Sequence, residues 1–204
     1  MREGLSLKDF QLQLPIFKPW KVLNRKRLFS VLPWFEIWNE RVQLPDGRII
    51  PDYYKITCPD ASVIVPLNEK GEVFILRQYR HGLGKTIWGL PAGMCHEGES
   101  SLNCAKRELL EETGCHAREW VDLGQYVRDA NRGAGKVHVF LARGTEKVKD
   151  ITSEDLEEHD VQLMKMEDVL LLVKDQQIET VGILFAILLA HYYFECEGYF
   201  QTLE

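Results

Sequence analysis

The apolar positions of this 204-residue chain occur mostly in short β-branched runs separated by turn-forming residues, a pattern that predicts several strands. Between residues 28 and 56, apolar and β-branched residues flank Pro45-Asp46-Gly47, which is typical of a tight turn between strands. Residues 62–66 and 73–78 flank the turn-like segment 68–71, and we expect them to form a hairpin. Further strands are expected at 120–127 and 136–142.

The segment between Ser100 and Gly114 has the pattern of an amphipathic helix. Leu102, Ala105 and Leu109 recur at helical spacing and predict a buried stripe. A serine at either of the first two positions can cap the start of the helix, and the glycine suits the left-handed residue that ends one.

Two further helices are expected near the C-terminus, at 166–174 and 179–194. The second is apolar on nearly every face, which indicates that it packs on the core. Residues 1–20 are mixed in character, and Pro15 and Pro19 argue against a long helix there. Mixed strands with helices before and after them fit an α+β fold, an α/β/α sandwich around a mixed sheet.

Length and composition agree with one main domain. The chain has 45% hydrophobic residues, enough for one sizeable core. We expect residues 1–55 to be an N-terminal extension with β-strands and residues 56–204 to be the main domain.

The charge and the cysteines exclude several classes of protein. A formal net charge of −6 argues against binding to a nucleic acid, because a phosphate backbone calls for a basic surface. Five scattered cysteines give neither a disulfide framework nor the spacing of a zinc site, so a reducing cytoplasm is the simplest location. The N-terminus lacks an apolar signal core, and the longest apolar run, 181–190, is too short to cross a bilayer.

Three acidic residues of the predicted helix 100–114 carry the most specific chemistry. Glu108, Glu111 and Glu112 are related by i, i+3 and i+4, so their carboxylates share one arc of the helix. Such a face can simply be solvated, but three adjacent like charges destabilise a helix. A hard divalent cation with oxygen ligands removes that repulsion. The spacing therefore favours a metal site.

The acidic face belongs to a longer pattern, G-x5-E-x7-R-E-x-x-E-E-x-G, that resembles the signature of the Nudix hydrolases, enzymes that cleave nucleoside diphosphates linked to another group. The resemblance implies that Glu108, Glu112 and the carbonyl of Ala92 hold Mg²⁺ or Mn²⁺, and that Glu111 lies close to the metals and the attacking water. It also implies structural roles for the remaining residues of the pattern, Gly93, Glu99, Arg107 and Gly114.

The segment from Val73 to Gly114 resembles the ADP-ribose pyrophosphatase branch of that family, whose members carry a similar RQYR strand before the signature. Arg77 and Arg80 of this strand are candidate phosphate contacts, because a forked guanidinium matches phosphate oxygens. They are three residues apart, hence on opposite faces of a regular strand, so both reach one phosphate only at a strand end or bend. Residues 128–133 depart from the branch, since they lack the proline of many ADP-sugar pyrophosphatases.

Aromatic residues of the N-terminal third are candidates for contact with a nucleobase. Trp20 and Trp38 carry indoles that can stack on a base. The alternative is that they lie in the core or in a subunit interface. The resemblance implies a homodimer in which the N-terminal strands cross to the partner and help to build the base pocket.

An acidic stretch, 153–160, is expected after the last strand of the sheet, where the ADP-ribose branch has an acidic loop. Glu157 and Glu158 are candidates for activating water or completing a metal shell. An exposed acidic loop without a catalytic role is the alternative.

These observations predict a Mg²⁺-dependent hydrolase that cuts the pyrophosphate of a nucleoside diphosphate sugar, with ADP-ribose giving AMP and ribose 5-phosphate as the leading case. One alternative is another nucleoside diphosphate derivative, such as GDP-mannose or a dinucleotide cofactor. The other is a module that senses a nucleotide sugar without turning it over.

Overall fold

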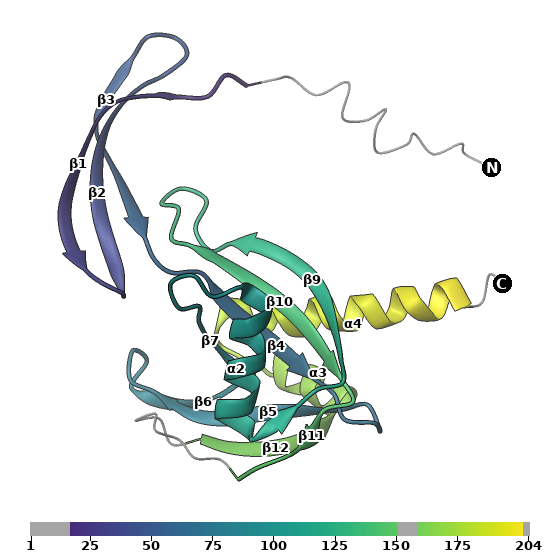
Figure 1. Cartoon of the computed structure of the whole chain (residues 1–204). Helices are drawn as coiled ribbons and strands as arrows, with labels where there is room; N and C mark the ends of the chain where they lie inside the picture. Colours follow the sequence, from purple (N-terminus) through teal and green to yellow (C-terminus); the bar gives the residue numbers. More distant parts are fainter. Residues whose placement is uncertain (1–16, 151–158, 202–204) are drawn as a thin grey trace, which may run out of the picture.

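The computed structural model describes residues 17–150 and 159–201 (Figure 1). Their strands form four sheets. The N-terminal sheet has the order β1 (Lys21–Val31), β2 (Phe35–Gln43), β3 (Ile49–Thr57). The central sheet has the order β7 (Ala92–Met94), β4 (Ala61–Pro66), β10 (Lys136–Arg143), β9 (Glu119–Val127). A third sheet has the order β12 (His159–Lys165), β5 (Glu72–Arg80), β6 (Lys85–Gly89), and a short pair joins β11 (Glu146–Lys147) to β8 (Cys115–His116).

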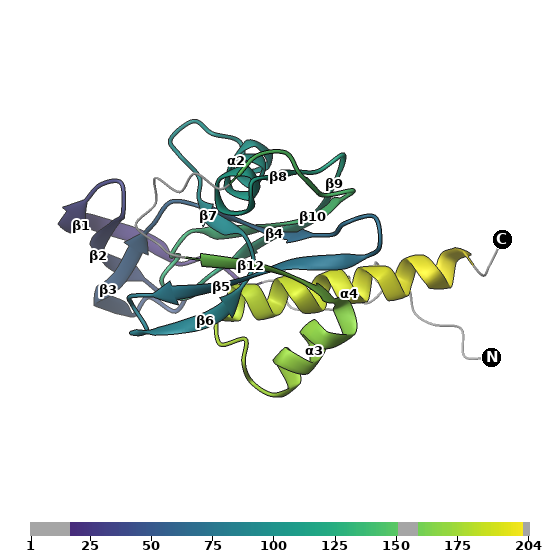
Figure 2. The same ribbon diagram turned by 90° about the horizontal axis from the view of Figure 1, so that it is seen from below.

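Three helices, α2 (Ser101–Thr113), α3 (Met166–Lys174) and α4 (Val181–Gln201), cover the sheets. Strand β4 separates two cores, because successive side chains of a strand point to opposite faces. Val63 and Val65 pack in a cluster with Ile187 of α4, whereas Ile64 packs with Leu109 of α2. Figure 2 shows α2 on one side of the sheets and α3 and α4 on the other. The predicted α+β fold, an α/β/α sandwich with mixed strand pairing, is confirmed.

The caps of α2 lie where the sequence places them. The hydroxyl of Ser100 accepts a hydrogen bond from the N–H of Asn103, at 3.3 Å. Gly114 has a left-handed φ of 68° and donates its N–H to the carbonyl of Leu110. A Cβ at Gly114 would lie 2.2 Å from the carbonyl oxygen of Lys149, so close packing as well as φ requires glycine there.

The predicted hairpin of residues 62–66 and 73–78 is wrong. The turn between them forms, with the side-chain oxygen of Asn68 accepting from the N–H groups of Lys70 and Glu72. Beyond one bridge between Leu67 and Val73, however, the two strands part into different sheets. Each strand has better partners far along the chain, since β4 pairs in parallel with β10 and β5 pairs with β12.

The predicted tight turn at Pro45-Asp46-Gly47 is confirmed, because it joins the antiparallel strands β2 and β3. A further strand, β1, begins at Lys21, before the predicted start at residue 28. Two other expectations need correction. The acidic stretch 153–160 does not follow the last strand, because its last two residues, His159 and Asp160, already belong to β12, which pairs with β5. The last helix runs over 181–201 and not 179–194, whereas α3 has the predicted bounds.

The N-terminal sheet stands apart from the sandwich (Figure 1). All residues of β1 are exposed, including Val22, Leu28 and Phe29, and β1 is an edge strand that pairs only with β2 among the described residues. A hydrogen bond of 3.0 Å from the N–H of Ile56 to the carbonyl of Arg132 helps to tie the sheet to the sandwich.

Candidate active site

Arg107 is the centre of a hydrogen-bond network on α2. Its Nε and Nη2 both donate to the carboxylate of Glu99, each at 3.0 Å, in a forked ion pair. Nη2 also donates to the carbonyl of Met94, at 3.0 Å. Nη1 donates to Glu108 at 2.6 Å and to Glu111 at 3.0 Å. One side chain thus fixes the loop before the helix and orients two of its acidic residues.

The network changes the ionisation of its members. The hydrogen bond from Arg107 holds the pKa of Glu99 below its usual range, although partial burial acts in the opposite direction. The N–H of His96 adds a second bond to the same carboxylate, at 2.9 Å. The bond to Glu99 is also the main cause of a raised pKa at Arg107. Both groups are therefore charged at neutral pH.

Two carboxylates of the acidic face are buried beside β7. Glu108 is 7% exposed and Glu112 is 6% exposed. An oxygen of Glu112 accepts a hydrogen bond from the N–H of Ala92, at 2.8 Å. The predicted ligands Glu112 and Ala92 therefore lie next to each other, although 20 residues separate them.

Gly93 makes room for the carboxylate of Glu108. A Cβ at Gly93 would lie 2.0 Å from one carboxylate oxygen and 2.4 Å from the other. Glycine is required here by this close approach, since the φ angle of Gly93 is not in the left-handed region. The glycine and the carboxylate act as one packing unit.

The donor set fits a hard cation. Glu108, Glu112 and the peptide of Ala92 offer oxygen atoms, which Mg²⁺ and Mn²⁺ prefer. Within residues 17–150 and 159–201, no three His, Cys, Asp or Glu side chains converge as a complete ligand cage. Mg²⁺ needs no such cage, because it keeps several waters and is usually held by one or two carboxylates plus substrate phosphates.

The candidates for water activation differ in position. Glu111 lies on the same helix face, but its side chain is 46% exposed and its carboxylate accepts from Arg107. Glu157 and Glu158 lie outside the described residues.

The two arginines of β5 do not meet in one site. Arg77 is exposed and stacks on the ring of Trp88, with 5.7 Å between guanidinium carbon and ring centroid. Arg80 lines a cavity of about 210 Å³ together with Gln78. Gln78, which is 2% exposed, is not among the site residues expected from the sequence. The available signal was its alternation with the apolar residues Phe74 and Leu76, which placed a polar side chain on a buried face.

The two candidate tryptophans lie at the N-terminal sheet, Trp38 on β2 and Trp20 directly before β1. Trp20 is 49% exposed and meets the ring of Tyr53 edge to face, with centroids 5.8 Å apart. Trp38 is half-buried beneath the guanidinium groups of Arg25 and Arg27, at 5.4 and 5.8 Å from the ring centroid. The structure therefore does not bring the two indoles together into one described pocket.

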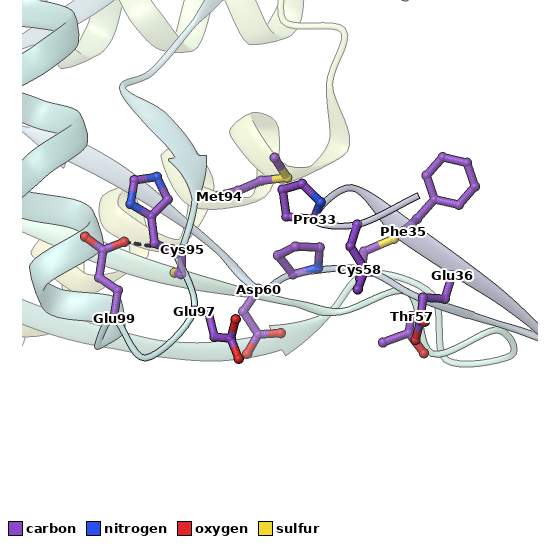
Figure 3. A pocket seen from close by; sticks show the side chains of 13 residues that line it. Pro33, Phe35, Glu36, Thr57, Cys58, Asp60, Met94, Cys95, Glu97 and Glu99 are labelled. Carbon is purple, nitrogen blue, oxygen red and sulfur yellow. Dashed lines mark hydrogen bonds between the residues drawn. The ribbon is translucent and has the colours of Figure 1, made fainter. Parts of the chain in front are cut away.

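A cavity of about 600 Å³ opens between the N-terminal sheet and the loop before α2 (Figure 3). Pro33, Phe35 and Met94 give it apolar walls. Four carboxylates also line it, those of Glu36, Asp60, Glu97 and Glu99. Among the described residues of the lining, the imidazole of His96 is the one basic side chain. Glu36 is paired with Arg27 and Glu99 with Arg107, so part of this negative charge is neutralised.

The cysteine at the start of α2 is buried and inert. Burial and the neighbouring Cys95 raise the pKa of the Cys104 thiol to about 12. Because the thiolate is the nucleophilic form, Cys104 is a packing residue at neutral pH.

The sequence of this chain is similar to those of known proteins. A family model described as the NUDIX domain matches residues 57–181. The chain is 27% identical over 168 residues to the ADP-ribose pyrophosphatase of Bacillus subtilis (strain 168). The aligned region covers 82% of this chain and 90% of that protein. The chain is 28% identical over 161 residues to the methanol dehydrogenase activator of Bacillus methanolicus, with coverages of 78% and 85%.

Two further relatives extend the comparison. The ADP-ribose pyrophosphatase of Mycobacterium tuberculosis (strain ATCC 25618 / H37Rv) is 33% identical over 119 residues, 56% of this chain and 55% of that protein. A solved structure described as the crystal structure of ADP compounds hydrolase has a TM-score of 0.77 at 19% identity, and covers 91% of this chain and 99% of its own. That last likeness concerns the fold. Among the described residues, no helix has the length and apolar character needed to cross a membrane.

Proposed function

This chain belongs to the Nudix family and is a pyrophosphohydrolase related to ADP-ribose pyrophosphatases, and we propose that its substrate is a nucleoside diphosphate sugar, with ADP-ribose cut to AMP and ribose 5-phosphate. The names of two relatives support this substrate. The observation that carries the proposal is the pair of buried carboxylates, Glu108 and Glu112, placed against Ala92 and Gly93.

The residues that would hold the metal are Glu108, Glu112 and the carbonyl of Ala92. When bound there, Mg²⁺ or Mn²⁺ neutralises charge on the phosphate oxygens and helps to orient water for attack on phosphorus. Arg107 holds the carboxylates of Glu108 and Glu111 in place. Glu111 then faces the reacting water, and Glu157 or Glu158 is the proposed base.

Arg80 is the proposed phosphate contact. Its cavity is close to the carboxylates, because Gly89, which also lines the cavity, precedes Ala92 by three residues, and that length of chain spans at most about 11 Å. Arg77 packs on Trp88 and does not line this cavity, so Arg80 is the arginine that we propose here. The local positive charge of Arg80 would attract an anion despite the acidic net charge of the chain.

We propose that residues 1–55 contact the nucleobase of the substrate and form the interface between two subunits. Trp20 offers an exposed indole for stacking, whereas the ring of Trp38 already packs against Arg25 and Arg27. The exposed apolar residues of β1 offer the contact for a second copy, since large apolar patches on a surface mark interaction sites. We therefore expect a homodimer with base pockets at the N-terminal sheets.

All five cysteines are free thiols. This supports a reducing compartment, and we propose the cytoplasm.

The experiment that tests the function measures product release from a panel of nucleotide sugars: ADP-ribose, GDP-mannose and a dinucleotide cofactor. Each is incubated with the purified full chain and Mg²⁺, Mn²⁺ or a chelator. We expect AMP from ADP-ribose with either metal and none with the chelator. Faster turnover of GDP-mannose or of the dinucleotide would show that this compound, and not ADP-ribose, is the preferred substrate. Tight binding of a nucleotide sugar with no product from any member would instead identify a sensing module.

A further inference from the structure

A single buried amide occupies the end of the apolar face of β5. Gln78 follows the buried residues Phe74 and Leu76 at alternate positions and is 2% exposed. Burying an amide is unfavourable unless its polar atoms are hydrogen-bonded. The partner is Arg80: with the amide oxygen of Gln78 facing the guanidinium, it accepts from Nη2 at 2.5 Å and from Nε at 3.0 Å.

The neighbouring strand is shaped to hold this amide. Gly89 of β6 lies so close that a Cβ there would be 3.0 Å from the amide atom of Gln78 that faces Arg80, which is the oxygen in this orientation. Ile87, directly opposite Gln78 across the two strands, is 4% exposed and packs beside it. The side chain of Gln78 therefore has little freedom to turn.

The pair lines the cavity of about 210 Å³ together with residues at the start of α4. Thr180 and Ile183 line the far side. The Thr180 hydroxyl is buried and has no hydrogen-bond partner among the described residues. Arg80 therefore meets a small, partly polar space beside the carboxylate site.

We propose that Gln78 is a positioning residue, whose amide oxygen holds the guanidinium of Arg80 in the orientation that binds a phosphate of the substrate. The inference rests on the proposed function, in which Arg80 contacts that phosphate. An arginine held in advance loses less conformational freedom when the anion binds. A neutral amide also leaves the positive charge of the guanidinium undiminished, which a carboxylate at position 78 would offset.

The test is a double-mutant cycle with Gln78→Met and Arg80→Ala, with KM and kcat measured on ADP-ribose and on GDP-mannose. Methionine keeps the length of the side chain and removes the acceptor. We expect Gln78→Met to raise KM roughly 10-fold, on the scale of a lost hydrogen bond to a charged group, with a much smaller change in kcat. In the Arg80→Ala background, Gln78→Met should leave KM unchanged, because there is no guanidinium left to position.

Gln162→Met is the matched control, since this glutamine lies on the adjacent strand β12 and bonds Asp160 instead. It should leave KM unchanged. Gln78→Glu provides a second variant, which keeps an acceptor of the same shape but adds a charge. It should raise KM without lowering the melting temperature, and it covers the case in which Gln78→Met fails to fold.

The outcomes separate the inference from the proposed function. An unchanged KM in Arg80→Ala refutes the contact between Arg80 and the substrate, and the inference with it. If KM rises in Arg80→Ala but not in Gln78→Met, only the positioning role of Gln78 is refuted. An equal effect of Gln78→Met in both backgrounds shows that Gln78 acts on the fold and not through Arg80.

Discussion

The carboxylate of Glu112 and the main-chain N–H of Ala92 form a hydrogen bond of 2.8 Å that joins the last turn of α2 to β7. The bond places a buried carboxylate against Ala92, the residue whose carbonyl we propose as a metal ligand. The helix and the strand are thereby held as one unit.

Glu112→Gln should lower turnover by roughly 100- to 1,000-fold, equivalent to about 2.7 to 4 kcal/mol, the scale of losing one charge-stabilising group. The fold should be almost unaffected, because the amide oxygen of glutamine can still accept from Ala92. The check is kcat on the best nucleotide sugar together with a thermal melt. Glu97→Gln, at the rim of the acidic cavity, is the control and should keep parental turnover. Turnover of Glu112→Gln close to the parent would contradict its role.

Gly93→Ala should lower kcat by roughly 100-fold while the protein remains folded. The new methyl group would displace the Glu108 carboxylate, which can swing aside because it is the end of a flexible side chain. Gly82→Ala, where a Cβ meets open space, is the control. The measurements are kcat and the melting temperature. Full activity in Gly93→Ala would show that the position of Glu108 is not critical.

Arg107→Lys should lower thermal stability and activity together, because lysine cannot reproduce the forked bond to Glu99 or reach the other partners at once. Arg118→Lys, an exposed arginine paired with Glu69, should change neither quantity. Melting curves and kcat of both variants provide the test. Lost activity with an unchanged melting curve would place Arg107 in the chemistry and not in the fold.

The pH dependence of stability should contain a contribution from Glu99. Its pKa in the folded state lies below 4.5, the usual value that it regains on unfolding. The unfolded state thus binds the proton more readily, so the contribution is present above about pH 4.5 and is lost as pH falls through the lowered value. Denaturant titrations of the parent and of Glu99→Gln should therefore differ most near neutral pH and converge in acid. A constant difference at all pH values would argue against the ion pair.

Trp20→Ala should raise KM roughly 5- to 150-fold with little change in kcat, matching about 1 to 3 kcal/mol of stacking on the base. The penalty should be smaller for CDP-ribose, which offers less ring surface. Trp34→Ala, in the exposed turn between β1 and β2, serves as the control. Sedimentation analysis of the same variants tests the alternative. An unchanged KM with a dimer that now dissociates would make Trp20 an interface residue.

The sequence by itself determined the features that depend on neighbours along the chain. The caps of α2, its buried stripe and the common face of Glu108, Glu111 and Glu112 all follow from contacts within about four residues, which helical periodicity fixes. The bounds of α3 also follow from the local sequence pattern.

Tertiary structure decided what the local pattern leaves open. Alternation shows that β4 and β5 are buried strands, but it does not say which strand pairs with which, so the predicted hairpin failed against the distant partners β10 and β12. The contacts that build the site, Glu112 with Ala92 and Glu108 with Gly93, likewise join residues separated along the chain. Only the folded chain could put Gln78 and Arg80 in the same cavity as the start of α4, because nothing in the local pattern of β5 specifies which helix packs against it.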